Sequence, residues 1–180
     1  MYTQIDKMGS KFNSLQREIW IHHDLFSPEW WSIVIINVLF LILFILLIDR
    51  YRMLLISFAF MVNFVIVGLA NEFGSNFDFW SYPHQFVVFT HRFNAVDFAV
   101  VPVIMSLIYQ FFSRWKAYFL ATIVMSAIMS FIGVPIFVYF GLYKLENWNY
   151  MYSFLVTVLM LIISKLIIDF VGKNAKRYSH

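Results

Sequence analysis

The chain has 180 residues, of which 62% are hydrophobic and only 13% are charged, about half of the ~25% that is usual in a soluble domain. It contains no cysteine, which excludes disulfides, thiolate metal ligands and a cysteine nucleophile. The formal net charge of +3 comes from basic residues beside apolar stretches, so nucleic acid is not an expected partner.

Residues 1–28 predict an amphipathic helix at the membrane interface. Apolar side chains recur at steps of three and four residues, beginning with Ile5, Met8, Phe12 and Leu15, and polar side chains take the positions between them. The stretch has no apolar region long enough for a signal peptide or a span. Its apolar stripe either lies on lipid or a partner, or rests on the protein's own bundle.

Five apolar stretches are predicted to cross the bilayer, whose ~30 Å core requires ~20 helical residues. The link at residues 49–52 is so short that the first two spans are expected to return antiparallel and pack as neighbours. The fold class is therefore all-α, a polytopic bundle of five transmembrane helices at residues 29–172, followed by a basic tail at residues 173–180. The spans cover residues 30–48, 53–70, 93–112, 117–140 and 150–171.

Residues 71–92, between the second and third spans, mix glycine, proline, histidine and acidic residues with aromatic side chains. The apolar run from Phe86 to Phe89 is too short to span a bilayer. We expect an interfacial or re-entrant segment here, because irregular backbone is tolerated at membrane depth only against protein or a wet cavity.

The basic residues predict an orientation. With five spans, eight of the 13 lysines and arginines lie on the side of the two short hairpins and the C-terminal tail, and five lie on the other side. Because cytoplasmic loops carry the excess of lysine and arginine, the N-terminus is expected outside and the C-terminus in the cytoplasm.

Asp97 is the main ionisable residue of the predicted third span, and such residues mark functional sites or specific partners. We expect a polar pocket at the outer face, with Asp97 as its deepest acid and Arg92 or a histidine as its counter-ion. The alternative is a capping box, in which Asn94 caps the span and Asp97 interacts with its free N–H groups. The candidate binding residues are Glu72, Asp78, His84, His91, Arg92 and Asp97.

Other polar residues within the spans have structural interpretations. Asn37 and Asn63 each lie roughly 16 to 18 Å from the inner hairpin at ~1.5 Å per helical residue, which predicts a hydrogen bond between them, with a pore-lining role as the alternative. Lys165 and Asp169 are one helical turn apart and predict an ion pair near the inner end, with the lysine snorkelling.

Motifs for metals, nucleotides and nucleophilic catalysis are absent from the sequence. His22 and His23 are adjacent and cannot both face one ion from a regular helix, and His84 and His91 are separated by a loop. The sequence has no HExxH, no P-loop and no arrangement of nucleophile, base and orienting group. We therefore expect no catalytic residues, no cofactor and no resident metal.

The order and spacing of certain aromatic and proline residues also resemble those of a known protein family. These residues are Trp30-Trp31, Tyr82-Pro83, Val101-Pro102 after Asp97, Tyr109-Gln110, Trp115, Pro135, Tyr143 and Trp148. In order and spacing this set resembles a family of small, uncharacterised integral membrane proteins of spore-forming Bacillota, over most of the chain after residue 20. The resemblance implies a bacterial plasma membrane and carries no activity with it.

Three functions are expected from these features. The first is a non-enzymatic bundle that binds or moves a lipid headgroup or small polar solute through the outer pocket, with Pro102 and Pro135 kinking their helices. The second is a membrane enzyme acting on a lipid, with His84 or His91 as base and Asp97 as orienting group. The third is a scaffold subunit that assembles through the N-terminal stripe. Expected partners are membrane lipids and a second copy or another membrane protein.

Overall fold

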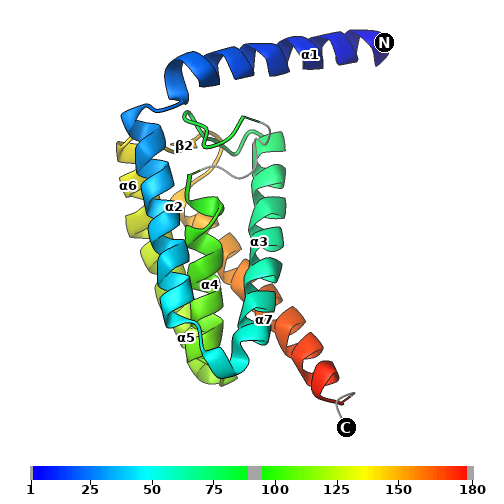
Figure 1. The fold of residues 1–180 in the computed structure, drawn as a ribbon, viewed down its shortest axis with the longest axis vertical. Coiled ribbons are helices and arrows are strands. Elements are labelled where there is room, and N and C mark those ends of the chain that lie inside the picture. The colour runs from blue at the N-terminus through cyan, green and yellow to red at the C-terminus, as the bar shows by residue number, and fades with distance from the viewer. Residues whose placement is uncertain (1, 89–94, 178–180) are drawn as a thin grey trace.

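The computed structural model describes residues 2–88 and 95–177 and is dominated by helices (Figure 1). Four helical segments in this part of the chain are long and apolar enough to cross a membrane. They are α2 (Pro28–Leu47), α3 (Met53–Asn76), the segment Trp115–Tyr139, and α7 (Tyr150–Arg177). The chain is thus a helical membrane protein, as its composition predicts.

The segment Trp115–Tyr139 is continuous but not regular. It consists of α5 (Trp115–Ile128), a π-helical turn (Met129–Gly133) and α6 (Val134–Tyr139). Pro135 lies in the first turn of α6, directly after the π-helical turn. Because proline cannot donate the hydrogen bond that a regular α-helix needs at an interior position, the wider turn accommodates it without ending the helix.

The third predicted span is shorter than expected. Helix α4 (Val100–Phe111) has 12 residues, so it is about 18 Å long at ~1.5 Å per residue and does not match a ~30 Å bilayer core. Residues 95–97 form a 3₁₀ turn before it. Pro102 lies in the first turn of α4, where its missing N–H is not needed, so it marks the start of the helix and does not kink it.

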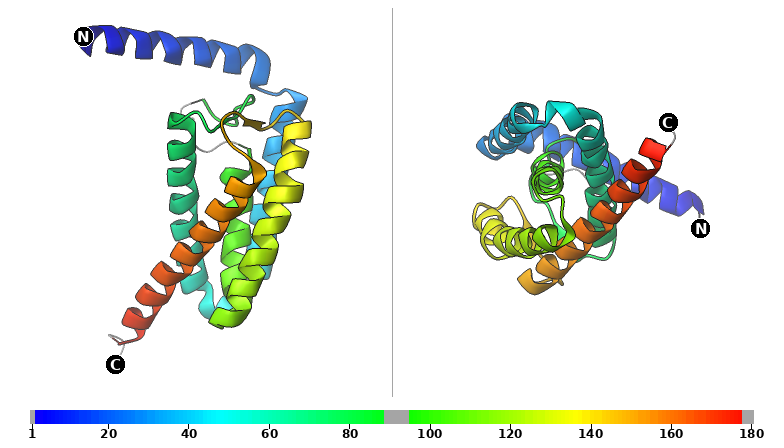
Figure 2. Two further views of the ribbon diagram at one scale, coloured as in Figure 1. Left: turned by 180° about the vertical axis from the view of Figure 1, so that it is seen from behind. Right: turned by 90° about the horizontal axis from the view of Figure 1, so that it is seen from below.

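Helix α4 occupies the centre of the bundle, and most of its side chains are buried. The view along the bundle in Figure 2 shows α4 surrounded by the longer helices. It packs against both α2 and α3, which separate from each other away from their hairpin. The prediction that the first two spans pack as neighbours is therefore wrong over most of their length, and holds only near the hairpin, where the rings of Phe44 and Phe60 are 5.2 Å apart.

The predicted bond between Asn37 and Asn63 is replaced by bonds to α4 and α7. Asn37 Oδ1 accepts the backbone N–H of Ala99 at 3.0 Å. Asn63 Nδ2 donates to Ser106 Oγ at 2.9 Å, and Asn63 Oδ1 accepts from the Ser164 hydroxyl. The two asparagines do not meet because α4 lies between α2 and α3. Both asparagines are buried and join helices, so their structural role remains.

Two hairpins meet at the end of the bundle near the C-terminus (Figure 1). Gln110, at the end of α4, accepts the backbone N–H of Asp49 at 2.9 Å and donates to the carbonyl of Leu47 at 2.8 Å. Arg52 donates from Nη2 to the carbonyl of Gln110 at 2.7 Å. These bonds join the α2–α3 hairpin to the start of the α4–α5 hairpin.

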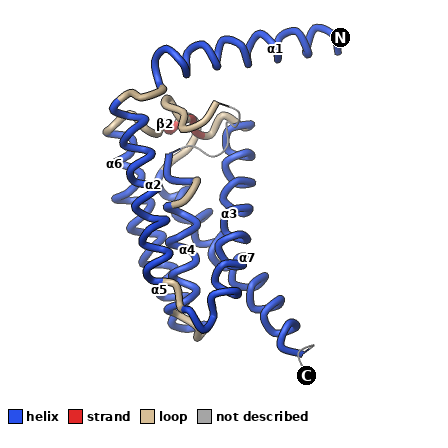
Figure 3. The backbone as a smooth tube through the Cα atoms, viewed as in Figure 1, coloured by secondary structure: helices blue, strands red, loops and turns tan. Residues whose placement is uncertain are grey.

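At the opposite end, two loops cover the bundle (Figure 3). Their two-residue strands β1 (Trp80–Ser81) and β2 (Lys144–Leu145) pair antiparallel, with Trp80 opposite Leu145. We call residues 77–88 and 140–149 the lid. The described part of the predicted interfacial or re-entrant segment thus contains the last turns of α3 and one half of this lid.

Helix α1 (Tyr2–Ile19) projects sideways from the lid end of the bundle (Figures 1 and 2). Its apolar stripe is exposed to between 49% and 73% at Ile5, Met8, Phe12, Leu15 and Ile19. The stripe therefore does not rest on the protein's own bundle. A π-helical turn (Trp20–Asp24) connects α1 to the bundle, and Trp20 Nε1 donates to the carbonyl of Gln85 at 3.0 Å.

Candidate binding cavity

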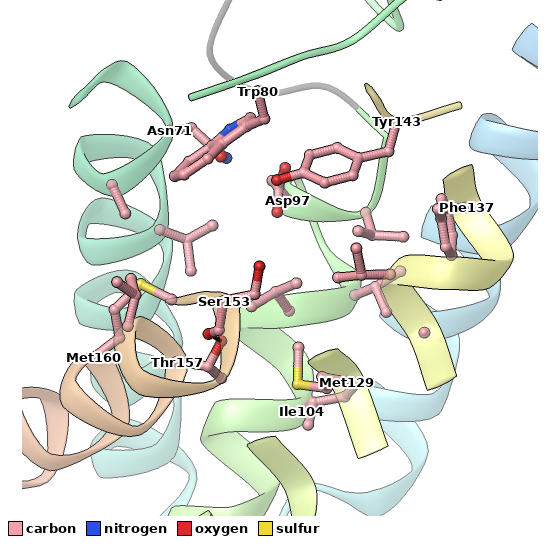
Figure 4. A pocket seen from close by; sticks show the side chains of 18 of the residues that line it. Asn71, Trp80, Asp97, Ile104, Met129, Phe137, Tyr143, Ser153, Thr157 and Met160 are labelled. Carbon is pink, nitrogen blue, oxygen red and sulfur yellow. Dashed lines mark hydrogen bonds between the residues drawn. The ribbon is translucent and has the colours of Figure 1, made fainter. Parts of the chain in front are cut away.

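A cavity of about 330 Å³ lies inside the bundle directly below the lid. Its walls come from α3, α4, the α5–α6 segment and α7, and they are almost entirely apolar, as Figure 4 shows for Ile104, Met129, Phe137 and Met160. This volume lies at the small end of the ~300–1,000 Å³ range of ligand sites. The cavity is thus large enough for a small ligand.

Polar side chains gather on the lid side of this cavity. Asp97 comes from the 3₁₀ turn before α4, Asn71 from the upper part of α3, and Trp80, Tyr82 and Tyr143 from the lid itself. Figure 4 shows Asn71, Trp80, Asp97 and Tyr143 together above the apolar walls. We call these five residues the polar roof. The cavity is therefore amphipathic: polar groups gather at one end, and the walls below are apolar apart from Ser153 and Thr157 on α7.

Hydrogen bonds centred on Tyr82 organise the polar roof. The Tyr82 hydroxyl donates to Asp97 Oδ2, and its oxygen also lies 2.9 Å from Asn71 Oδ1. Burial raises the pKa of Tyr82 well above its usual value, and the negative charge of Asp97 raises it further, so Tyr82 stays protonated and acts as the donor. One phenol proton serves one acceptor at a time, so the roof has more acceptors than Tyr82 can satisfy.

Two buried donors of the polar roof make no hydrogen bond of regular geometry among the described residues, although Asp97 and Tyr82 lie beside them. They are Asn71 Nδ2 and Trp80 Nε1. Leaving a buried donor unpaired costs about 1–3 kcal/mol. The described residues that line the cavity also include no lysine, arginine or histidine beside the buried carboxyl group of Asp97. The polar roof thus presents a buried carboxyl group and two N–H donors to a further hydrogen-bonding group.

The packing of the lid on α3 positions Trp80. Its ring lies against Gly74, where a Cβ atom would be 2.0 Å from Trp80 Cζ2. The other neighbours of this indole are Trp148, with ring centroids 5.0 Å apart, and Tyr143, at 6.4 Å. Only glycine at position 74 permits this approach, so this residue of α3 determines how closely the lid packs against the helix.

Of the four predicted binding residues that the structure describes, Asp97 lines the cavity, and Glu72, Asp78 and His84 do not. Glu72 lies on α3 outside the lining and accepts from Asn76 Nδ2 at 2.7 Å. Asp78 is exposed in the lid, with a φ of 53°. His84 bonds to the N-terminal segment. His91 and Arg92 lie outside the described residues.

The capping-box interpretation of Asp97 does not fit α4. This helix begins at Val100, after Asp97, and its N-cap residue is Ala99, which makes no side-chain capping bond. The carboxyl group of Asp97 accepts instead from Tyr82. Asn94, the predicted cap, lies outside the described residues.

His84 pairs with a residue that the sequence did not indicate. Its Nδ1 lies 3.0 Å from Oδ1 of the buried Asp24, and Oδ2 of Asp24 accepts the backbone N–H of Gln85 at 3.2 Å. Asp24 ends the π-helical turn after α1. The histidine therefore holds the lid to the N-terminal segment and lies outside the cavity lining.

Replacing Asp24 with alanine is expected to loosen this part of the lid. Hydrogen bonds to a charged group contribute about 1.5–3 kcal/mol, so amide hydrogen exchange in residues 82–88 should become about ten-fold faster or more. Hydrogen exchange with mass spectrometry measures this, with Asp6→Ala on the exposed part of α1 as the control. Equal exchange in both variants would show that Asp24 does not hold the lid.

Metal binding finds no support in the described ranges, 2–88 and 95–177, because no three His, Asp or Glu side chains come together there in a way that would hold an ion.

Several members of the polar roof were not among the predicted binding residues. Trp80, Tyr82 and Tyr143 face the cavity because the lid loops pair through β1 and β2, and Asn71 faces it from the upper part of α3. Strands of two residues, separated by more than sixty positions, leave no periodic pattern in the sequence. The only sequence signal was the aromatic character of both loops, which equally fits a headgroup region.

These features define a polytopic helical membrane protein with an amphipathic cavity beneath a two-loop lid. No protein-family model, no curated protein and no solved structure matches the chain. The resemblance to a Bacillota membrane-protein family and the bacterial plasma membrane that it implies remain predictions.

Proposed function

We propose that this protein binds an amphiphile in the cavity below the lid, with the apolar part against the walls and a neutral or cationic polar head at Asp97. The observation that carries the proposal is the polar roof, in which the buried carboxyl group of Asp97 lies above an apolar space with no cationic side chain among the described lining residues. A hydroxyl head donates to Asp97 and accepts from the N–H groups of the roof, whereas an ammonium head pairs with the charge of Asp97. A carboxylate head would place a second negative charge beside Asp97.

The proposal includes five crossings of the membrane. In it, α4 and the 3₁₀ turn at residues 95–97 form the third crossing at the centre of the bundle, where the surrounding helices shield a segment that is shorter than a full span. Irregular backbone at membrane depth is tolerated where protein or a cavity covers it, and the 3₁₀ turn at Asp97 borders such a cavity. In this arrangement the lid lies at the outer face and the hairpins lie in the cytoplasm.

The binding test uses three probes of one chain length that differ only in the head: octylamine, octanol and octanoate. The protein in nanodiscs is titrated with each, and the fluorescence of the cavity-lining Trp80 and Trp148 is followed. We expect octylamine to bind about ten-fold more tightly than octanoate, a difference of ~1.4 kcal/mol, with octanol between them.

Asp97→Asn is expected to abolish this preference while octanol still binds, because the amide keeps the shape of the carboxyl group and removes its charge. Asp78→Asn is the matched control, since Asp78 is exposed in the lid and outside the cavity lining. Equal affinities for the three probes in the unchanged protein, or loss of the preference in the control as well, would contradict the proposed role of Asp97.

The enzymatic alternative is less well supported by the described residues. It requires a histidine base near Asp97, and His84 is instead bonded to Asp24 and does not line the cavity. The scaffold alternative is favoured by one observation, the exposed apolar stripe of α1. We propose it as a second function for that helix, compatible with binding in the cavity and tested by loss of a partner when residues 2–19 are deleted.

A further inference from the structure

A second cavity, of about 390 Å³, lies at the opposite end of the bundle, and its lining shares no residue with the cavity below the lid. Its lining comes from the two hairpins and from α7, and Figure 1 shows the positions of these elements. Three of its lining residues are basic, namely Arg52, Lys165 and Lys173, and one, Asp169, is acidic. This cavity is therefore basic, whereas the cavity below the lid has an acidic residue in its roof.

Lys165 and Asp169 form the inner wall of this cavity. Lys165 is only 1% exposed, and its Nζ lies 3.3 Å from Asp169 Oδ2 and donates to the carbonyl of Ser113 at 3.1 Å. Aromatic rings of Tyr109, Trp115 and Tyr118 surround the ammonium group at 4.8 to 5.1 Å. Asp169 Oδ1 also accepts from the Tyr109 hydroxyl at 2.9 Å. The negative charge of Asp169 is thus already neutralised by Lys165 within the wall.

Arg52 and Lys173 provide the donors that remain for a ligand. Arg52 uses Nε for Asp49, at 2.9 Å, and Nη2 for the carbonyl of Gln110, which fixes its guanidinium group and leaves the Nη1 donors. Lys173 is exposed on the last part of α7 and has no ion pair among the described residues. Even with Asp49 counted, three cations face two carboxylates, so the cavity keeps a net positive charge.

The position of the cavity indicates the kind of anion. Arg52 directly precedes α3 and Trp115 opens α5, so the lining lies where membrane helices end and where lipid phosphates are found. Leu55 and Gly172 give the cavity an apolar side. Basic pockets between membrane helices at this level bind anionic headgroups.

We propose that the cavity between the hairpins and α7 binds a phosphate group, held by Arg52 and Lys173 against the wall formed by Lys165. The group belongs either to an anionic phospholipid or to free phosphate. The site is independent of the amphiphile cavity, because neither its residues nor its charge are shared with the polar roof.

The test measures the thermal unfolding of the full chain in detergent with phosphatidylglycerol, with phosphatidylcholine or with inorganic phosphate. Phosphatidylglycerol is expected to raise the Tm by about 3 °C or more, and phosphatidylcholine is expected to leave it unchanged. A Tm shift with phosphatidylglycerol alone assigns the group to a lipid. A shift with inorganic phosphate that prevents the lipid effect assigns it to free phosphate. Absence of both shifts overturns the proposal.

Matched variants locate the site. Lys173→Gln is expected to remove at least half of the Tm shift, and Lys116→Gln, an exposed lysine at the same end outside the lining, is expected to keep it. Arg52→Gln is likewise expected to reduce the Tm shift, and Arg50→Gln, outside the lining, is expected to keep it. The side chain of Lys173 makes no hydrogen bond or ion pair with the described residues, so its variant remains informative even if Arg52→Gln fails to fold. Equal loss of the shift in Lys173→Gln and Lys116→Gln would overturn the assignment.

Discussion

Replacing Gly74 with alanine is expected to destabilise the protein and to displace the Trp80 ring from the lid. A Cβ atom at this position would lie 2.0 Å from a ring atom of Trp80, and the indole is enclosed by Trp148 and Tyr143. Such overpacking costs about 1–3 kcal/mol. Thermal unfolding in detergent, followed by tryptophan fluorescence, should show a lower Tm and a changed emission of the folded state.

Gly9→Ala is the matched control for this substitution. Gly9 is also within a helix, but nothing lies within 4 Å of a Cβ atom there. Alanine in an exposed helix is favoured over glycine by about 0.5–1 kcal/mol, so this variant should be unaffected or slightly stabilised. Equal unfolding temperatures and unchanged emission in both variants would show that Trp80 does not pack against Gly74. The described arrangement of the polar roof would then also be incorrect.

Replacing Lys165 with methionine is expected to have the second large effect. The lysine is 1% exposed, and its removal leaves the carboxylate of Asp169, which is 23% exposed, without its cation. Breaking a buried ion pair from one side costs about 3–5 kcal/mol, and the partial exposure of Asp169 points to the lower end of that range. The measurement is the free energy of unfolding from denaturant titration in mixed micelles.

Two further variants separate loss of charge balance from loss of packing. Lys116→Met removes an exposed lysine at the same end and should change stability by less than about 0.5 kcal/mol. The double variant Lys165→Met, Asp169→Asn removes both charges and keeps an acceptor for the Tyr109 hydroxyl. It should recover more than half of the loss. No recovery would mean that the aromatic packing around Lys165, and not its charge, holds this end together.

Much of the fold follows from hydropathy and length. The boundaries of α2 and of the Trp115–Tyr139 segment lie within two residues of prediction, because long apolar stretches flanked by Ser27-Pro28 or by a basic hairpin leave few other arrangements. The ion pair between Lys165 and Asp169 was also predicted, since one helical turn places them on one face. The lysine is nevertheless buried among aromatic rings and does not snorkel.

The site depends on features that hydropathy does not encode. Hydropathy alone does not show whether a helix faces lipid or lies at the centre of the bundle, so the central position of α4 was not predicted. That position gives Asn37 and Asn63 their bonds to α4, and it sets Asp97 below the lid. Asp97 itself was found because an acid in an apolar stretch is exceptional. Tyr82 and Trp80 were not selected, because aromatic residues are ordinary near headgroups.

Labelling of single cysteines from each side of the membrane tests the account most directly, since the chain has no cysteine of its own. Suitable exposed positions are Ser10, Arg50, Arg114, Asn147 and Lys173. We expect an impermeant thiol reagent to reach positions 10 and 147 from the outer side, and positions 50, 114 and 173 only from the cytoplasmic side. Labelling of positions 114 and 147 from the same side would contradict it, because the lid and the hairpins would then not lie on opposite faces.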